Sequence, residues 1–183
     1  MEGRFRVAAL AGRRVDAADT SPPRFPLERV STVRSALRAL FSSAGVADLV
    51  SSAACGADLT ALQAALAPPP LRRHVVLPFE AERFLRTSVI DRPGPWQAVF
   101  AQVLADAATE VNDLACSGDN DEAYSQANER ILQWALELAA GTQPLAIVVW
   151  NRHVRRDGDA TADFRARAAE LGFAIRDVNP LGG

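Results

Sequence analysis

A run of small residues from Ser51 to Gly56, followed by Asp58, contains the first residues that could do chemistry. The run follows a short apolar pair and precedes a stretch rich in Ala and Leu, an order typical of a strand, a tight turn and a helix. The N–H groups and positive dipole at a helix start attract phosphate or carboxylate groups. We therefore expect Ser52, Gly56 and Asp58 to contact a phosphate or sugar. An ordinary turn in which Asp58 meets only the helix dipole is the alternative.

Further polar residues follow two other predicted strands. Arginine can bind a phosphate through its forked guanidinium, and neighbouring hydroxyl groups suit a phosphate or a sugar. The same side chains could instead belong to solvated surface loops. The predicted ligand-binding residues of these two loops are Gly12, Arg13 and Asp16 after the first strand and Arg83, Thr87 and Ser88 after the third.

Aromatic and amide side chains could recognise a base. Tyr124 and Asn128 lie four residues apart in a predicted helix and share one face, so the ring could stack on a base while the amide reads its edge. Trp150, at the end of the most apolar strand, could wall the base pocket. Gly158 and Thr161 open the last helix, where the Thr161 hydroxyl and N–H could bind phosphate. Packing and helix-start roles without any ligand are the alternatives.

The composition excludes several kinds of chemistry. The sequence has no lysine, which excludes a phosphate-loop NTPase, a Schiff base and pyridoxal chemistry. His74 and His153 are isolated, and no Cys/His cluster has zinc-ligand spacing, so we expect no metal and no cofactor. Cys55 and Cys116 are predicted to be free thiols.

Strands and helices alternate along the whole chain. This alternation predicts an α/β fold of the Rossmann-like, doubly wound type, with a mainly parallel sheet of about six strands between two helix layers. In such a sheet ligands bind beyond the carboxyl ends of the strands, where the strand order reverses. The predicted strands are 5–10, 48–51, 74–77, 110–114, 145–150 and 173–178, and the predicted helices are 27–41, 58–67, 80–86, 96–107, 121–140 and 160–171.

Length and charge are those of an ordinary globular protein. The 183 residues suit one domain, 1–183, and about half of them (49%) are apolar. No apolar run is long enough to cross a membrane and no signal peptide is recognisable, so we expect a cytoplasmic protein without a membrane partner. Arg152, Arg155 and Arg156 form a small basic patch. Because the net charge is −2 and no basic stripe is interleaved with aromatic residues, we do not expect nucleic-acid binding.

The order of the loop motifs resembles the SLOG superfamily of nucleotide-binding domains. This superfamily includes the Lonely Guy phosphoribohydrolases, the DNA-processing protein A family and sensor-like domains of prokaryotic signalling and conflict proteins. The resemblance covers most of the chain. The motifs that carry it are Gly-Arg-Arg-Val-Asp at 12–16, Ser-Ser-Ala-Ala-Cys-Gly-Ala-Asp at 51–58, Val-Val-Leu-Pro-Phe at 75–79, Glu-Arg-Phe at 82–84, Thr-Ser-Val at 87–89, Tyr-Ser-Gln-Ala-Asn at 124–128 and Gly-Asp-Ala-Thr-Ala-Asp at 158–163.

The resemblance implies binding or sensing of a nucleotide or nucleotide-derived molecule, reported to an effector domain or protein, in a homodimer. An alternative is cleavage of the N-glycosidic bond of a nucleoside 5′-monophosphate, with Asp163 and Arg86 as catalytic residues. The phosphoribohydrolase motif has a Pro-Gly-Gly run and a glutamate three residues after its threonine, where this chain has Phe164. That departure favours binding over catalysis. Single-stranded DNA binding, as in the DNA-processing relatives, is a second alternative.

Overall fold

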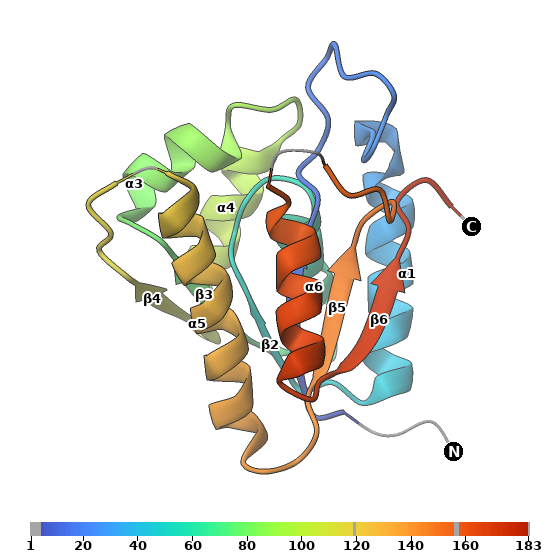
Figure 1. The fold of residues 1–183 in the computed structure, drawn as a ribbon, viewed down its shortest axis with the longest axis vertical. Coiled ribbons are helices and arrows are strands. Elements are labelled where there is room, and N and C mark those ends of the chain that lie inside the picture. The colour runs from blue at the N-terminus through green and yellow to red at the C-terminus, as the bar shows by residue number, and fades with distance from the viewer. Residues whose placement is uncertain (1–4, 119, 156–157, 183) are drawn as a thin grey trace.

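A single six-stranded sheet forms the centre of the chain in the computed structural model, which describes residues 5–118, 120–155 and 158–182 (Figure 1). The strand order is β4-β3-β2-β1-β5-β6, and every neighbouring pair is parallel. The predicted Rossmann-like, doubly wound α/β fold is therefore confirmed. The strands are β1 (Val7–Gly12), β2 (Asp48–Ser51), β3 (Arg72–Leu77), β4 (Thr109–Asp113), β5 (Leu145–Val149) and β6 (Ala174–Val178).

Helices cover both faces of the sheet. Helices α1, α2 and α4 pack on one face, whereas α5 and α6 pack on the other and stand in front of the sheet in Figure 1. This is the layering that right-handed crossovers between parallel strands produce. The helical segments are η1 (Leu27–Arg29), α1 (Val30–Ala44), α2 (Ala57–Leu66), α3 (Ala81–Phe84), the π-helical turn η2 (Leu85–Val89), α4 (Trp96–Ala105), α5 (Asp121–Ala139) and α6 (Ala160–Glu170).

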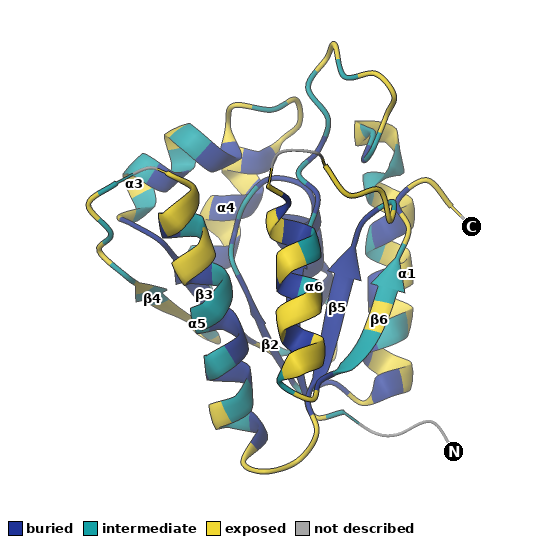
Figure 2. Cartoon of the chain, in the orientation of Figure 1, coloured by how far each residue is buried: buried dark blue, intermediate teal, exposed yellow. Residues whose placement is uncertain are grey.

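The central strands are buried on both faces because helices cover them from both sides (Figure 2). In β1, Ala8 and Leu10 belong to the core under α1, α2 and α4, whereas Val7 and Ala9 belong to the core under α5 and α6. All five residues of β5 are buried, as its unbroken apolar run indicates. The edge strands β4 and β6 are partly exposed, which explains their more polar sequences.

The predicted ends of several elements differ from the structure. Strand β1 runs two residues beyond its predicted end, to Gly12. Helix α1 begins at Val30, because the chain first makes a short 3-10 turn in which the Leu27 side chain is 38% exposed. The helix predicted over 80–86 is α3 followed by the π-helical turn η2, which extends the helical segment to Val89.

The order of the strands positions the site. Successive strands from β1 to β4 move outward in one direction, and the chain then crosses back through α5 to place β5 on the other side of β1. The loops after β1 and β5 therefore diverge at the carboxyl edge, and the space between them is where such sheets bind ligands. Within the described segments, no helix is long and apolar enough to cross a membrane.

Candidate functional site

Two joined cavities lie at the carboxyl edge of the sheet. The smaller, of about 330 Å³, is bounded by the end of β1, the turn after β2, η2 and the starts of α5 and α6. The larger, of about 590 Å³, lies between the first turns of α5 and α6. Both are within the size range of pockets for small ligands. The residues that line both cavities, and so mark their junction, are Asp121, Tyr124, Asn128, Arg155, Asp159 and Ala160.

Many of the residues predicted from the sequence line these cavities, although they come from distant parts of the chain. The parallel sheet brings them together by ending all its strands at one edge. Those on the smaller cavity are Gly12, Arg13, Ser52, Asp58, Ser88, Tyr124, Asn128 and Thr161. Those on the larger cavity are Tyr124, Asn128, Gly158 and Asp163.

Other predicted residues do not line either cavity. The Asp16 carboxylate accepts hydrogen bonds from the N–H groups of Arg24 and Phe25, at 2.8 and 2.9 Å. It thereby stabilises the proline-containing loop at 21–26. Trp150 is buried, and its indole Nε1 donates to Asp177 at 3.1 Å. Both residues support the loops around the site, and the interpretation of them as ligand contacts needs this correction.

The loop after β3 also points its arginines away from the cavities. The Arg86 guanidinium is exposed and pairs with Glu82 at 2.5 Å. The Arg83 guanidinium lies 4.5 Å from the centre of the Phe79 ring, and the Thr87 hydroxyl donates to the Arg83 carbonyl at 3.1 Å. Neither Arg83, Arg86 nor Thr87 lines a cavity. Arg86 and Thr87 lie in the π-helical turn η2, and Ser88 of the same turn lines the smaller cavity.

The backbone N–H groups of the turn after β2 donate hydrogen bonds to other groups of the protein. The Ala57 N–H donates to the Arg13 carbonyl at 3.0 Å, and the Cys55 N–H donates to the Ser88 carbonyl at 2.9 Å. The Ala54 N–H donates to the Asp58 carboxylate at 3.3 Å. The expectation that this turn offers its N–H groups to a phosphate is therefore wrong for these three amides. Those of Ala57 and Cys55 tie the turn to the loop after β1 and to η2, and that of Ala54 bonds to a side chain of α2.

Gly56 makes the turn possible without touching the cavities. Its φ of +102° lies in a region that side chains disfavour, and a Cβ atom there would sit 2.5 Å from the Val15 nitrogen and 2.7 Å from the Arg13 oxygen. The functional interpretation of Gly56 as a ligand contact is thus replaced by a structural one, the close approach of the turn to the loop after β1.

A buried ion pair holds the two diverging loops together. The Arg13 guanidinium donates to both oxygens of Asp159, at 2.6 and 2.7 Å, and to the His153 carbonyl at 2.6 Å. The two side chains are only 3% and 2% exposed. Burial alone would raise the pKa of Asp159, but hydrogen bonds from Arg13 and from backbone N–H groups outweigh burial and hold that pKa at about 2. The Arg13 guanidinium is therefore already paired with an anion, the Asp159 carboxylate.

Asp58 is a carboxyl group in the opposite situation. It is 8% exposed and lines the smaller cavity. Burial raises its pKa to about 7, because the single amide hydrogen bond from Ala54 and the charge of Arg14 offset only part of the desolvation. Asp58 can thus carry a proton near neutral pH and donate a hydrogen bond into the cavity.

Arg155 is a residue of the candidate site that the sequence indicates only as part of a small basic patch. It lines both cavities, and within the described residues its guanidinium makes no ion pair or hydrogen bond. Partial burial and repulsion by Arg13, Arg24 and Arg92 lower its pKa, and Asp159 opposes this. Arg155 therefore stands among other arginines at the rim of the site, and their combined positive charge favours an anionic ligand. Of its neighbours in that patch, Arg152 pairs with Asp177, and residue 156 lies outside the described residues.

Tyr124 and Asn128 stand together on α5, as their spacing predicts. The Tyr124 hydroxyl lies 3.0 Å from the Ser88 hydroxyl. The Tyr124 ring packs edge-on against the Phe79 ring, with 6.1 Å between the ring centres. The Asn128 side-chain amide donates to the Ala160 carbonyl at 3.2 Å and so connects α5 to α6. Both side chains are half-buried and form the wall where the two cavities join.

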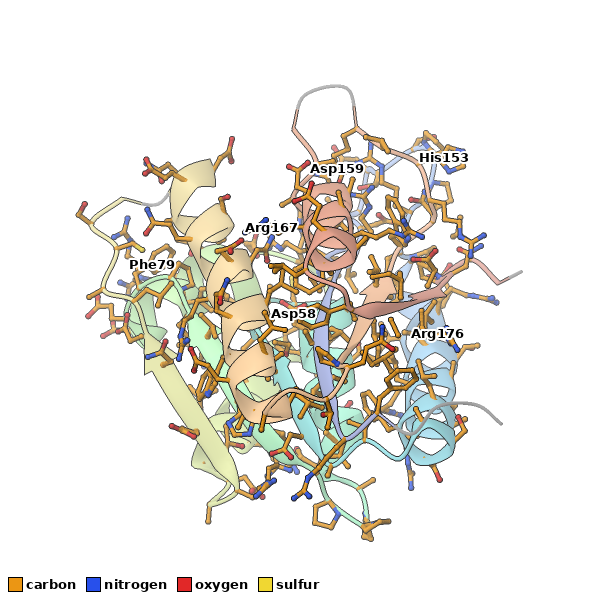
Figure 3. The ribbon with its side chains drawn as sticks, turned by 60° about the horizontal axis from the view of Figure 1, so that its bottom comes forward. Asp58, Phe79, His153, Asp159, Arg167 and Arg176 are labelled. Carbon is orange, nitrogen blue, oxygen red and sulfur yellow. The ribbon has the colours of Figure 1, made fainter. Side chains whose placement is uncertain are left out.

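The larger cavity has an acidic lining. Asp121, Glu122 and Asp163 lie in the first turns of α5 and α6, where negative charge is favourable against the helix dipoles. Figure 3 labels Asp159 and Arg167, which line this cavity, and Asp58, which lines the smaller one. Among the described residues, no group of three or more His, Cys, Asp or Glu side chains could hold a metal ion.

No family model matches this chain, and a search of curated proteins finds no similar protein. The likeness to the SLOG superfamily therefore rests on the sequence motifs.

Replacing Gly56 by alanine should destabilise the fold strongly. The added Cβ would meet backbone atoms, and the positive φ alone costs about 1–2 kcal/mol, so we expect a loss of roughly 3 kcal/mol or more in the free energy of unfolding. Urea denaturation measures this loss. Gly141→Ala is the matched control, because its φ is +86° but nothing lies within 4 Å of the added atom. Equal losses in the two variants would contradict the interpretation.

Asp58 should make the stability depend on pH. Its folded pKa of about 7 lies above the ordinary value of 3.8, so its protonated form stabilises the native state. The stabilisation is complete below about pH 4 and is lost as the pH rises through about 7, by an amount on the order of 4 kcal/mol. Asp58→Asn should lack this dependence. The measurement is the unfolding free energy of both proteins from pH 4 to 8, and parallel curves would show that Asp58 does not titrate in this way.

Proposed function

We propose that this chain binds a nucleotide or nucleotide-derived small molecule in the joined cavities at the carboxyl edge of the sheet. The observation that carries the proposal is the cavity pair at the divergence of β1 and β5, lined by Arg155, Tyr124, Asn128 and Asp58. Sheets of this type bind nucleotides at that point. The resemblance of the loop motifs to SLOG proteins supports the same ligand class.

The charges of the two cavities suggest how such a ligand would lie. Arg155 provides a guanidinium for a phosphate at the junction of the cavities, and no carboxylate of the described residues pairs with it. The carboxylates of Asp121, Glu122 and Asp163 would repel a phosphate but can accept hydrogen bonds from ribose hydroxyl groups. We therefore place the nucleoside part in the larger cavity and any phosphate at the junction, near Arg155.

The walls of the site can recognise a base and a hydroxyl group. Tyr124 presents an aromatic side chain beside the amide of Asn128, and the two together suit stacking and edge contacts. Ser52 and Asp58 can bond to the ligand from the smaller cavity, with Asp58 as a donor when it is protonated. Each of these groups is held by the loops and helices described above.

The alternative of N-glycosidic cleavage requires Asp163 and Arg86 to act on one substrate. Asp163 lines the larger cavity, but Arg86 pairs with Glu82 on the surface and lines neither cavity. We therefore propose binding rather than this cleavage mechanism. By the same resemblance we propose that ligand occupancy is reported to an effector domain or protein, within a homodimer.

A thermal-shift panel tests the proposal. The panel holds the common nucleosides, their 5′-monophosphates, NAD derivatives and cyclic dinucleotides. A ligand at one hundred times its Kd stabilises the native state by about 2.7 kcal/mol, which raises the Tm by roughly 5–10 °C. A folded protein whose Tm is unchanged by every member of the panel would contradict the proposal.

Arg155→Gln should weaken binding of the phosphorylated ligand selectively. A hydrogen bond to a charged group contributes about 1.5–3 kcal/mol, so we expect a loss in affinity of roughly 10- to 100-fold for the 5′-monophosphate and little change for the nucleoside. Arg152→Gln is the matched control, because Arg152 lies in the same loop, pairs with Asp177 and lines neither cavity. Calorimetry measures the affinities, and equal effects of the two substitutions would exclude this role for Arg155.

A further inference from the structure

Among the residues that the structure describes, five hydrogen-bond donors converge on the carboxylate of Asp159. The Arg13 guanidinium supplies two of them, at 2.6 and 2.7 Å. The Arg155 N–H donates at 2.9 Å from the preceding loop. The N–H groups of Thr161 and Ala162, in the first turn of α6, donate at 3.1 and 3.2 Å. Asp159 thus receives an arginine fork, a loop amide and the start of a helix together.

This set of donors is the kind that proteins use to bind phosphate. Arginine forks match the geometry of phosphate oxygens, and helix N-termini offer free N–H groups and a favourable dipole. Arg13 is 3% exposed, and its buried Nε atom has no hydrogen-bond partner within residues 5–118, 120–155 and 158–182, so its guanidinium offers a donor that Asp159 does not use. A buried guanidinium without an anion would be strongly destabilising, so an anion must occupy this position.

We propose that Asp159 is a specificity-determining residue whose carboxylate occupies the anion position between Arg13 and the start of α6, and so excludes a ligand's phosphate from it. Asp159 lies at the junction of both cavities, so it faces whatever enters either of them. A ligand meets a filled anion position there and places its phosphate near Arg155 instead. The placement of the ligand rests on the proposed function, whereas the anion position does not.

The backbone N–H of Thr161, which the sequence predicts as a phosphate donor, is used by Asp159. The hydroxyl and N–H of Thr161 were expected to bind phosphate at the start of the last helix. The N–H instead donates to Asp159, and Thr161 is buried beneath it. The donors that the motif predicts are present, but an aspartate of the chain uses them.

Removing the Asp159 carboxylate should create a phosphate site. We expect 10 mM inorganic phosphate to raise the Tm of Asp159→Ala by about 4 °C relative to sodium chloride of equal ionic strength, if the Kd is near 1 mM. The wild-type Tm should rise by less than about 1 °C under the same conditions. Adding Arg13→Ala to Asp159→Ala should abolish the gain, since the guanidinium is then absent.

Asp177→Asn is the matched control. It removes another carboxylate that arginines hold, with Arg165 at 3.1 Å and Arg152 at 3.4 Å, but none of the described helix amides donates to it. We expect no phosphate-specific gain in this variant. If Asp159→Ala does not fold, Asp159→Asn serves in its place, because an asparagine keeps an acceptor for the α6 amides and loses the charge. Equal phosphate responses of the wild type and the Asp159 variant, or a gain that survives Arg13→Ala, would overturn the proposal.

Measuring nucleotide affinities as well distinguishes a failure of this inference from a failure of the proposed function. The ratio of the affinities for a 5′-monophosphate and its nucleoside should rise at least tenfold in the Asp159 variant over the wild type, and an unchanged ratio would overturn the placement of the ligand. If the wild type binds no member of the panel, the proposed function fails, while the inorganic phosphate measurement still decides the role of Asp159.

Discussion

The ion pair between Arg13 and Asp159 is the interaction on which the site depends. It joins the loop after β1 to the start of α6, across the point where the sheet changes direction. Both side chains are removed from water, a large cost that the paired geometry and the additional amide donors offset. The same contact fixes the backbone of the loop after β5, because the amide of Arg155 bonds to Asp159 and the carbonyl of His153 accepts from Arg13. This contact holds the backbone of Arg155, and so it places the Arg155 guanidinium at the junction of the cavities.

The chain satisfies the helix starts at the carboxyl edge with its own groups. At α2 the Ala57 amide donates to the Arg13 carbonyl, at α5 the Asn120 side chain caps the Ala123 amide, and at α6 the cap is Asp159. A doubly wound sheet usually offers such amides to a phosphate. Here an exposed guanidinium takes over that role in the proposed site, and the acidic first turns of α5 and α6 suit hydroxyl groups instead.

Two aspartates at this edge show how donors decide the behaviour of a buried carboxyl group. Asp159 has donors for both of its oxygens, and its pKa is held at about 2. Asp58 is buried to a similar extent but receives one long amide hydrogen bond, so burial raises its pKa to about 7. One aspartate is therefore a permanent anion that organises the loops. The other can exchange a proton at neutral pH where a ligand would lie, and this makes it a chemically responsive group of the cavity.

The sequence by itself determined the fold class, the alternation of six strands with helices and the edge at which the site lies, because hydrophobic periodicity and turn residues are local properties of the chain. It also selected Tyr124 and Asn128, whose shared face follows from helical spacing. Only the tertiary structure decided how the charges pair. Arg13 and Asp159 are 146 residues apart, and no local pattern shows that one neutralises the other. The π-helical turn that contains Arg86 and the burial that raises the pKa of Asp58 likewise arise from packing between distant segments. Residue type and position in the strand order indicated where the candidate site lies. The partner of each charged group was decided by contacts between distant segments, which form only in the folded chain.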